Sequence, residues 1–180
     1  MYDCGSHIYD GTVDDRTANL VAALVVALSD ELEAGSTQVA GQSAVGTAAL
    51  ATLLSAPGAR VDALGRVLGL TGSGTVRLVD RLVAAELVER RRDTSDLRGV
   101  SLWLTDQGRA AATEVVTRRR EVVARALAPL SDAQRAVVAE AVEPVLAELV
   151  KDRSRADRVC RFCDYSVCPE ADCPVERAVP

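Results

Sequence analysis

The sequence predicts a mainly α-helical fold with one small β-hairpin. Hydrophobic residues make up 48% of the 180 residues but aromatic residues only 3%. The core must therefore consist of Ala, Val and Leu, and Ala and Leu favour helices. Apolar residues recur at helical spacing along most of the chain and alternate with polar residues only near residues 86–104. A chain of this length forms one domain, or one domain with a small appendage.

The first part of the chain predicts two helices. One extends from Thr12 to about Ala34, with acidic residues near its start, where the helix dipole favours negative charge. Gly35 is expected to end this helix. The second extends from Gln42 to Ser55 and is rich in Ala, so neighbouring elements can pack closely against it.

Two shorter helices follow, and a tight turn separates them. Residues 61–70 place apolar side chains on one face, and Gly69 interrupts this pattern. Thr71 is suited to cap the next helix, which extends to about Ala85. Two helices joined in this way form a helix-turn-helix. The predicted buried face of the second helix consists of Val76, Val79, Leu82 and Val83.

The period of the apolar pattern then changes from helical to two residues, which predicts a β-hairpin. Its strands are "LVERR" and "GVSLWLT". Val100, Leu102 and Leu104 share one face, whereas Ser101 and Trp103 lie on the other. Trp103 is expected to pack against a neighbouring helix. A helix-turn-helix followed by such a hairpin is a winged helix, and the hairpin is its β-wing.

Two long helices complete the predicted fold. One spans about residues 106–127. The other begins at Ser131, where Gln134 completes a capping-box pattern, and extends to about Arg158. Pro144 lies inside this second helix and should kink it or end a first segment, because proline cannot donate a helical hydrogen bond.

Two short motifs follow the predicted helix-turn-helix. The wing carries "DLRG" (Asp96 to Gly99), and the second strand leads into "LTDQG" (Leu104 to Gly108). With these motifs, the segment from residue 68 to residue 110 resembles the MarR family of bacterial transcription regulators. With the flanking helices, the resemblance covers roughly residues 12–150. It implies a winged helix-turn-helix flanked by long dimerisation helices, and a homodimer that binds a pseudo-palindromic operator in double-stranded DNA. It also implies repression or activation that is relieved by a small-molecule inducer, a metal or oxidation.

On this resemblance the chain divides into four parts. Residues 1–34 form an N-terminal arm and dimerisation helix, and residues 35–105 form the DNA-binding domain. Residues 106–158 form the C-terminal dimerisation helices, and residues 159–180 form a cysteine-rich metal-binding tail. We expect the protein to act as a transcription regulator, most simply a repressor.

The resemblance also places the DNA contacts. The recognition helix would enter the major groove with short polar side chains and one arginine; these residues are Thr71, Ser73, Thr75 and Arg77. Arg98 at the wing tip would enter the minor groove, and Asp96 would orient it. Phosphate contacts are expected from Arg90, Arg91 and Arg92.

Charge is unevenly distributed along the chain. The formal net charge is -5, yet residues 60–120 carry 12 basic and 8 acidic side chains. A local basic patch can contact phosphates whatever the net charge of the whole chain. The basic run of Arg118, Arg119 and Arg120 lies on a predicted long helix, where such a run is usually a solvent-exposed face.

An enzyme, a secreted protein and a membrane protein are all disfavoured. The chain has a single His, no Gly-rich phosphate loop after a strand and no nucleophile elbow. No signal peptide is visible, and the longest apolar stretch, Leu20 to Leu28, is too short to span a bilayer. We therefore expect a cytoplasmic protein that is not an enzyme and has no membrane partner.

Four of the five cysteines lie in the tail, with the spacing Cys-x2-Cys-x4-Cys-x4-Cys. They are Cys160, Cys163, Cys168 and Cys173. This spacing matches that of a zinc knuckle, and four thiolates suit tetrahedral Zn²⁺. An iron–sulfur cluster is the main alternative, because two of the cysteines precede proline as in ferredoxins. Metal-free thiols that oxidise and release DNA are the third.

The position of the tail beside the dimerisation helices suggests two further ligands, Cys4 and His7, because both chain ends lie in that region of the MarR arrangement. A different functional class is also open. The tail could be a zinc-knuckle-type RNA or protein interaction module, with Phe162 and Tyr165 as its stacking groups.

Overall fold

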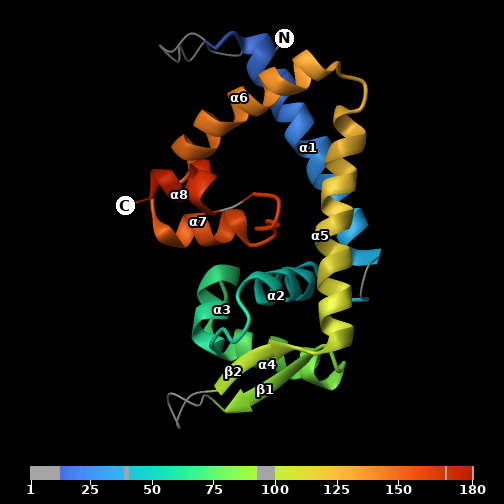
Figure 1. The fold of residues 1–180 in the computed structure, drawn as a ribbon, viewed down its shortest axis with the longest axis vertical. Coiled ribbons are helices and arrows are strands. Elements are labelled where there is room, and N and C mark those ends of the chain that lie inside the picture. The colour runs from blue at the N-terminus through green and yellow to red at the C-terminus, as the bar shows by residue number, and fades with distance from the viewer. Residues whose placement is uncertain (1–12, 39–40, 93–99, 169, 180) are drawn as a thin grey trace, which may run out of the picture.

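The computed structural model describes residues 13–38, 41–92, 100–168 and 170–179, and it is mainly helical (Figure 1). The elements in order are α1 (Asp15–Gln38), α2 (Ala44–Ser55), α3 (Val61–Leu68), α4 (Gly72–Ala84), β1 (Val88–Arg92), β2 (Val100–Leu104), α5 (Asp106–Leu127), α6 (Asp132–Leu149), α7 (Arg153–Cys160), a 3-10 turn at Glu170–Asp172, and α8 (Pro174–Ala178). The predicted fold class is confirmed.

Helix α5 is the long axis to which the other parts attach. At its N-terminal end lie α2, α3, α4 and the hairpin, and near its other end lie α1 and α6 (Figure 1). Helices α7 and α8 lie between α6 and the α2–α3 pair (Figure 1). Among the described residues, no helix is long and apolar enough to cross a membrane.

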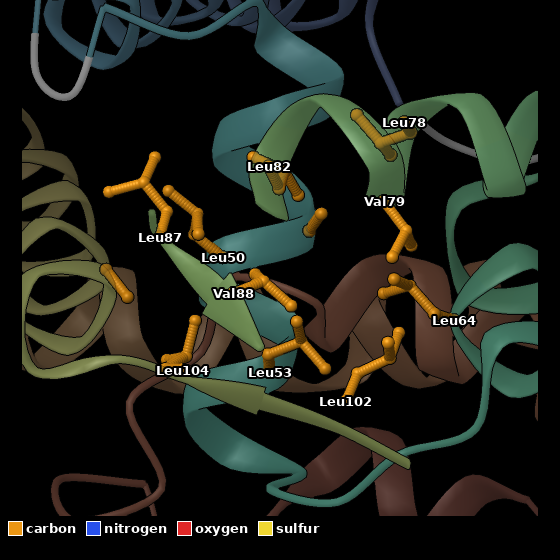
Figure 2. Packing of buried hydrophobic residues seen from close by; sticks show 12 residues of the cluster. Leu50, Leu53, Leu64, Leu78, Val79, Leu82, Leu87, Val88, Leu102 and Leu104 are labelled. Atoms are coloured by element: carbon orange, nitrogen blue, oxygen red, sulfur yellow. The ribbon is translucent and has the colours of Figure 1, made fainter. Parts of the chain in front are cut away.

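The main hydrophobic core lies within the winged helix and is built from Leu, Val and Ala, as the composition predicts. It joins α2, α3, α4, both strands and the start of α5 (Figure 2). The labelled residues of this core are Leu50, Leu53, Leu64, Leu78, Val79, Leu82, Leu87, Val88, Leu102 and Leu104. Burial of so many side chains, each contributing roughly 1.5–3 kcal/mol, fixes the helix-turn-helix against the hairpin.

The turn of the helix-turn-helix has the geometry that its sequence predicts. Gly69 ends α3 in the left-handed conformation, with φ of 67°, which glycine adopts without a Cβ penalty. Thr71 then caps α4, because its hydroxyl oxygen accepts a hydrogen bond from the N–H of Gly74 at 3.2 Å.

The buried face of α4 differs by one position from the predicted face. Val76 is 44% exposed, and Thr75 is buried in its place with Leu78, Val79 and Leu82. These positions are spaced at i, i+3, i+4 and i+7, which is a regular helical stripe. Thr75 fits because its partner on α3 is a glycine: a Cβ on Gly65 would lie 2.6 Å from the Thr75 Oγ1.

The hairpin pairs β1 and β2 in antiparallel register, with Val88 opposite Leu104 and Arg92 opposite Val100. Leu102 and Leu104 are buried as predicted, but Val100 at the open end is 40% exposed. Trp103 packs against a turn rather than the helix that was expected. Its ring lies over the turn before α3, 2.9 Å from where a Cβ on Gly58 would be, and its Nε1 donates to the Ser101 Oγ at 3.0 Å.

The Leu-Thr-x-x-Gly motif joins the hairpin to α5. The Thr105 hydroxyl accepts from the N–H of Gly108 at 2.9 Å and donates to the carbonyl of Glu86 at 2.7 Å. The backbone of Leu87 passes directly against Gly108: a Cβ there would lie 1.8 Å from the Leu87 carbonyl oxygen. The glycine is therefore required for the close contact between the wing and α5.

Some predicted helix boundaries are wrong. Gly35 does not end α1, which continues to Gln38, and at Gly35 a Cβ would only touch Val122 of α5 at 3.6 Å. The last predicted helix is two helices, because α6 ends at Leu149 and Asp152 caps a separate α7. Both hydrogen bonds of the predicted capping box at the start of α6 are present.

Pro144 lies inside α6 and does not end it. The break comes at residues 150–152 instead, where the chain turns so that Val150 is buried in a small second core with α7 and α8. A tertiary contact, rather than the proline, therefore decides where the helix ends.

Candidate nucleic-acid interface and cysteine cluster

The N-terminal half of α4 presents a polar face to solvent. Thr71, Ser73 and Arg77 are exposed on it, and Arg81 follows Arg77 one turn later. The Thr71 hydroxyl is engaged in the helix cap, so only its remaining lone pair and its proton face outward. The exposed N-terminal turn of a second helix in a helix-turn-helix is the part that can reach base edges.

Thr75 does not belong to this face, which corrects the prediction that it contacts DNA. Its side chain is 1% exposed, and its hydroxyl donates to the carbonyl of Thr71 at 2.9 Å. A buried hydroxyl with an internal partner cannot bind a base without opening the α3–α4 contact. Thr75 is a packing residue of the helix-turn-helix.

The arginines of β1 extend this face towards the hairpin. Arg90 forms an ion pair with Asp80 of α4 at 2.8 Å, which ties the strand to the helix. Arg91 pairs with Glu89, and its guanidinium lies 4.9 Å from the centre of the Trp103 ring. Arg92 is exposed. Exposed ion pairs contribute only about 0–1 kcal/mol, so phosphates can compete for these arginines.

Four further predicted site residues lie outside the described residues. They are Asp96 and Arg98 of the wing tip, and Cys4 and His7 of the N-terminal arm.

The four tail cysteines come from three neighbouring segments. Cys160 is the last residue of α7, Cys163 and Cys168 lie in the loop that follows, and Cys173 caps α8. Cys160 and Cys173 are buried, Cys163 is half-buried and Cys168 is exposed, and all four are free thiols. Each side chain interacts with others of the set: Cys160 with Cys163 and Cys168 with Cys173 through hydrogen bonds.

These contacts shift the pKa values of the thiols in opposite directions. The hydrogen bond with Cys160 and, more weakly, the guanidinium of Arg119 lower the pKa of Cys163 to about 7, although burial opposes this. The same hydrogen bond and burial raise the pKa of Cys160 far above its ordinary value. Burial is also the main cause that raises the pKa of Cys168, and it raises the pKa of Tyr165 to about 12.

The arrangement of side chains is not that of a formed metal site. Among the described residues, no three His, Cys, Asp or Glu side chains are placed so that they could hold one metal ion as they stand. The four cysteines therefore lie near one another without forming a metal site as they stand.

Comparisons with known proteins agree with the winged-helix geometry. The model of the MarR family matches residues 47–99. Among solved structures, RV1404 from Mycobacterium tuberculosis is 27% identical, with a TM-score of 0.64 over 75% of this chain and 95% of its own. A MarR family protein from Bacillus stearothermophilus is 24% identical, with a TM-score of 0.64 over 76% of this chain and 98% of its own.

This chain has a MarR-type fold. A third similar structure is a mutant of MepR from S. aureus bound to an oligodeoxyribonucleotide; it is 17% identical, with a TM-score of 0.58 over 73% of this chain and 96% of its own. A comparison with curated proteins found no match. The family match covers α2 to the wing, and it does not reach the tail.

Two arginines of α5 connect the MarR-type fold to the tail, and sequence analysis missed both. Arg118 is exposed as predicted and pairs with Glu121 at 3.2 Å. Arg119 instead lies over the ring of Phe162, 4.1 Å from its centre, and Arg120 forms an ion pair with Asp164 at 2.8 Å. The only signal in the sequence was the single Phe beside four cysteines, which does not reveal its partner.

The tail also contacts the other helices of the chain. Helix α7 packs against α3, and α8 packs against α6, where Arg177 pairs with Glu143 at 3.4 Å. Arg153 of α7 pairs with Glu176 of α8 at 2.7 Å. Between α5, α1 and the tail loop lies a largely apolar cavity of about 480 Å³, lined by Leu32, Val116, Arg119, Leu127, Phe162 and Cys163, among others.

Removing the Phe162 ring should loosen the tail. We expect Phe162→Ala to speed tryptic cleavage after Arg158 by roughly 2- to 30-fold, because a cation–π contact contributes about 0.5–2 kcal/mol. Tyr165→Ala removes another aromatic ring from the same loop, where the side chain is 40% exposed, and should change the rate less. Equal rates for Phe162→Ala and the unaltered protein would show that this contact does not hold the tail.

Proposed function

We propose that the protein is a sequence-specific DNA-binding transcription regulator of the MarR type. The observation that carries this proposal is the exposed face of α4, where Ser73 and Arg77 are exposed and Asp80 joins the helix to Arg90 of β1 on a winged helix. A surface of this composition suits a nucleic acid, since Arg binds both phosphates and guanine edges with a planar set of donors. The neighbouring MepR structure, bound to an oligodeoxyribonucleotide, supports the same use of the fold.

The arrangement suggests a division of roles along this face. Arg77 is placed to reach a base edge in the major groove, because it lies on the exposed side of the first turns of α4. Arg90, Arg91 and Arg92 extend away from that helix along β1 and suit phosphate contacts. Arg98, in the hairpin tip, is proposed to enter the adjacent minor groove, with Asp96 orienting it.

We also infer that the protein works as a homodimer through α1 and α6. Helix α6 has no buried residue, and residues 15–35 of α1 include none either. Both helices nevertheless expose large apolar side chains at the end of α5 distant from the hairpin (Figure 1). These are Leu20, Val21, Leu24, Val25, Val26, Val137, Val142, Val145 and Leu149.

A second copy of the chain is the partner that best fits this surface. Exposed apolar area of this extent is unfavourable in water and marks an interface. A two-fold symmetric pair would present two copies of α4, as binding to half-sites about one helical turn apart requires. The operator is then pseudo-palindromic.

The direction of regulation and its signal stay predictions. Repression is the simplest mode for a dimer that covers an operator. The apolar cavity between α1, α5 and the tail offers room for a small-molecule inducer at the place where the DNA-binding unit and the dimerisation helices meet. Binding there would alter the separation of the two recognition helices.

The alternative of an RNA-binding tail has less support. Phe162, one of its two proposed stacking groups, is already in contact with the guanidinium groups of Arg119 and Arg161, at 4.1 and 5.2 Å from the ring centre. A base that stacks on this ring would compete with these contacts. The duplex-binding surface on α4 needs no such rearrangement.

The proposal is tested by selecting duplexes from a random pool with the full-length protein and measuring affinities by gel shift. Arg77→Ala should weaken binding to the selected duplex by about 1–3 kcal/mol, which is about 5- to 150-fold. Arg90→Ala should reduce the slope of log affinity against log salt concentration by about 1, the change expected when one phosphate contact is lost. The matched control is Arg125→Ala, an exposed arginine at the other end of α5, which should leave affinity unchanged.

Two outcomes would contradict the proposal. One is the absence of any duplex bound more tightly than the random pool. The other is an unchanged affinity of both Arg77→Ala and Arg90→Ala, which would place the DNA elsewhere. Preference for single-stranded RNA over every duplex would favour the tail as the binding module.

A further inference from the structure

We propose that the four tail cysteines bind one Zn²⁺ ion, which closes the tail loop and fastens it against α5 and α3. The binding site itself is independent of the proposed DNA-binding function. Only its consequence for regulation, a tail that holds the DNA-binding unit in place, rests on that function.

The topology brings the four thiols together from both sides of one loop. Cys160 ends α7, Cys173 begins α8, and these two helices pack against each other. Three of the thiols share one core, because Cys160 and Cys173 are buried in the second core and Cys163 packs against it. Cys168 interacts electrostatically with Cys163 and Cys173, so the fourth thiol lies near the same core.

The donor set and its spacing suit zinc. Four thiolates form a tetrahedral Zn²⁺ site with Zn–S bonds of about 2.3 Å. Two residues separate Cys160 from Cys163 and four separate Cys168 from Cys173, and both spacings fall within the two to four residues that separate paired cysteine ligands of zinc. Four cysteines can also hold an iron–sulfur cluster, and the colour and metal content of the protein distinguish the two.

Formation of the site requires the thiols to rearrange. As they stand, no three of the described His, Cys, Asp or Glu side chains form a group that could hold a metal ion. Cys168 is exposed and Cys163 is half-buried, so both can change rotamer without disturbing the buried pair, Cys160 and Cys173. Zn²⁺ imposes no strict d-electron geometry, so it tolerates the arrangement that the loop permits.

The size of the second core indicates that the tail needs such a cross-link. Its fully buried members are Val150, Ala156, Cys160, Cys173 and Val175. Five small side chains bury too little apolar surface to offset the ordering of about 30 residues. In small zinc domains metal binding supplies the free energy that drives folding.

Four thiolates and one divalent ion form a centre with a net charge of -2. The guanidinium of Arg119 interacts electrostatically with Cys163 and compensates part of this charge. Two carboxylates act in the opposite sense, Glu176 on Cys160 and Asp172 on Cys168. Glu176 is itself engaged by Arg153 at 2.7 Å.

The contacts of the loop explain what the metal would control. The two residues that dock on α5, Phe162 and Asp164, both lie between the first and last cysteine. Helix α7, which ends at the first cysteine, packs against α3 of the helix-turn-helix. Loss of zinc would therefore release the loop from α5 and loosen a support of the DNA-binding unit.

The test uses full-length protein purified anaerobically without chelator, with elemental analysis, an absorption spectrum and mass spectrometry of alkylated thiols. We expect one zinc per chain, a colourless sample, and four tail thiols that an alkylating reagent reaches only after zinc is chelated. Replacement of zinc by Co²⁺ should produce the visible bands of tetrahedral thiolate coordination.

The variant Cys168→Ser removes the exposed ligand, which is the one least needed for packing. It should weaken zinc binding by about 10-fold or more in a chelator competition. Its matched control is Cys4→Ser, the same chemical change at the fifth cysteine, which should retain zinc. Circular dichroism of both variants establishes that the winged helix remains folded.

Four outcomes would overturn the proposal: folded protein without stoichiometric zinc, a brown sample containing iron, disulfides between the tail cysteines under anaerobic conditions, or equal zinc affinity of Cys168→Ser and the unaltered protein. Loss of zinc from Cys4→Ser would overturn the four-cysteine ligand set. None of these measurements includes DNA. Their result is therefore independent of the result of the duplex selection described above.

Discussion

Gly108→Ala should destabilise the winged helix by more than about 3 kcal/mol, the largest effect expected of any single methyl group in this protein. The added Cβ would lie 1.8 Å from the carbonyl oxygen and 2.8 Å from the carbonyl carbon of Leu87. Both are backbone atoms, so no side-chain rotation can relieve the overlap. Either α5 must move away from the hairpin or the strand must shift, and each change breaks the Thr105 hydrogen bonds.

The measurement is the free energy of unfolding from urea titrations followed by circular dichroism. Gly72→Ala is the matched control, because nothing lies within 4 Å of the Cβ it would add at the start of α4. This control should be neutral, or stabilising by up to about 1 kcal/mol, because alanine favours helices more than glycine does. If the urea concentration at the unfolding midpoint is the same, within error, for Gly108→Ala and the control, α5 and the wing are not in the contact described.

A charge in the proposed dimer interface should have the largest effect on function. Leu24→Glu places a carboxylate in the middle of α1, on a side chain that is 52% exposed in the single chain. The substitution should cost little in the isolated chain but several kcal/mol in a dimer, where the charge would be buried without a partner. We expect a monomer, with operator affinity lowered by at least about 100-fold, because bivalent binding is lost.

Sedimentation analysis and gel shift measure the two consequences separately. Val167→Glu is the control, since it adds the same charge to an exposed apolar position in the tail loop, 63% exposed and outside the two helices of the proposed interface. It should remain dimeric and bind the selected duplex. If the Leu24→Glu variant is still a dimer, the interface does not include the middle of α1. If the unaltered protein is a monomer at micromolar concentration, the proposed dimer is wrong.

The helix-turn-helix and the wing could be predicted because their signals are local. The turn depends on Gly69 and Thr71, which act within three residues of themselves through backbone conformation and capping. The junction at Thr105 and Gly108 could be recognised as a motif, although the reason for the glycine appears only when Leu87 is placed against it. The change in apolar period was enough to locate both strands.

The errors in the site arise where packing decides among similar side chains. Thr75 and Val76 are adjacent and both are β-branched, so the sequence alone favours burial of the valine. The glycine at position 65 reverses that choice, because it admits the Thr75 hydroxyl at a distance that no Cβ would allow. The predicted contacts at the wing tip, Asp96 and Arg98, lie outside the described residues and stay predictions.

The sequence by itself determined the element types, the helix caps, the winged-helix order and the presence of four closely spaced cysteines, because these depend on neighbours within a few residues. Only the tertiary structure decided that α6 ends at Leu149, that Arg119 and Arg120 dock the tail on α5, and that Cys160, Cys163 and Cys173 pack in one core. The ion pair between Arg120 and Asp164 joins residues 44 positions apart. Such contacts depend on the path of the whole chain, and no local pattern records that path.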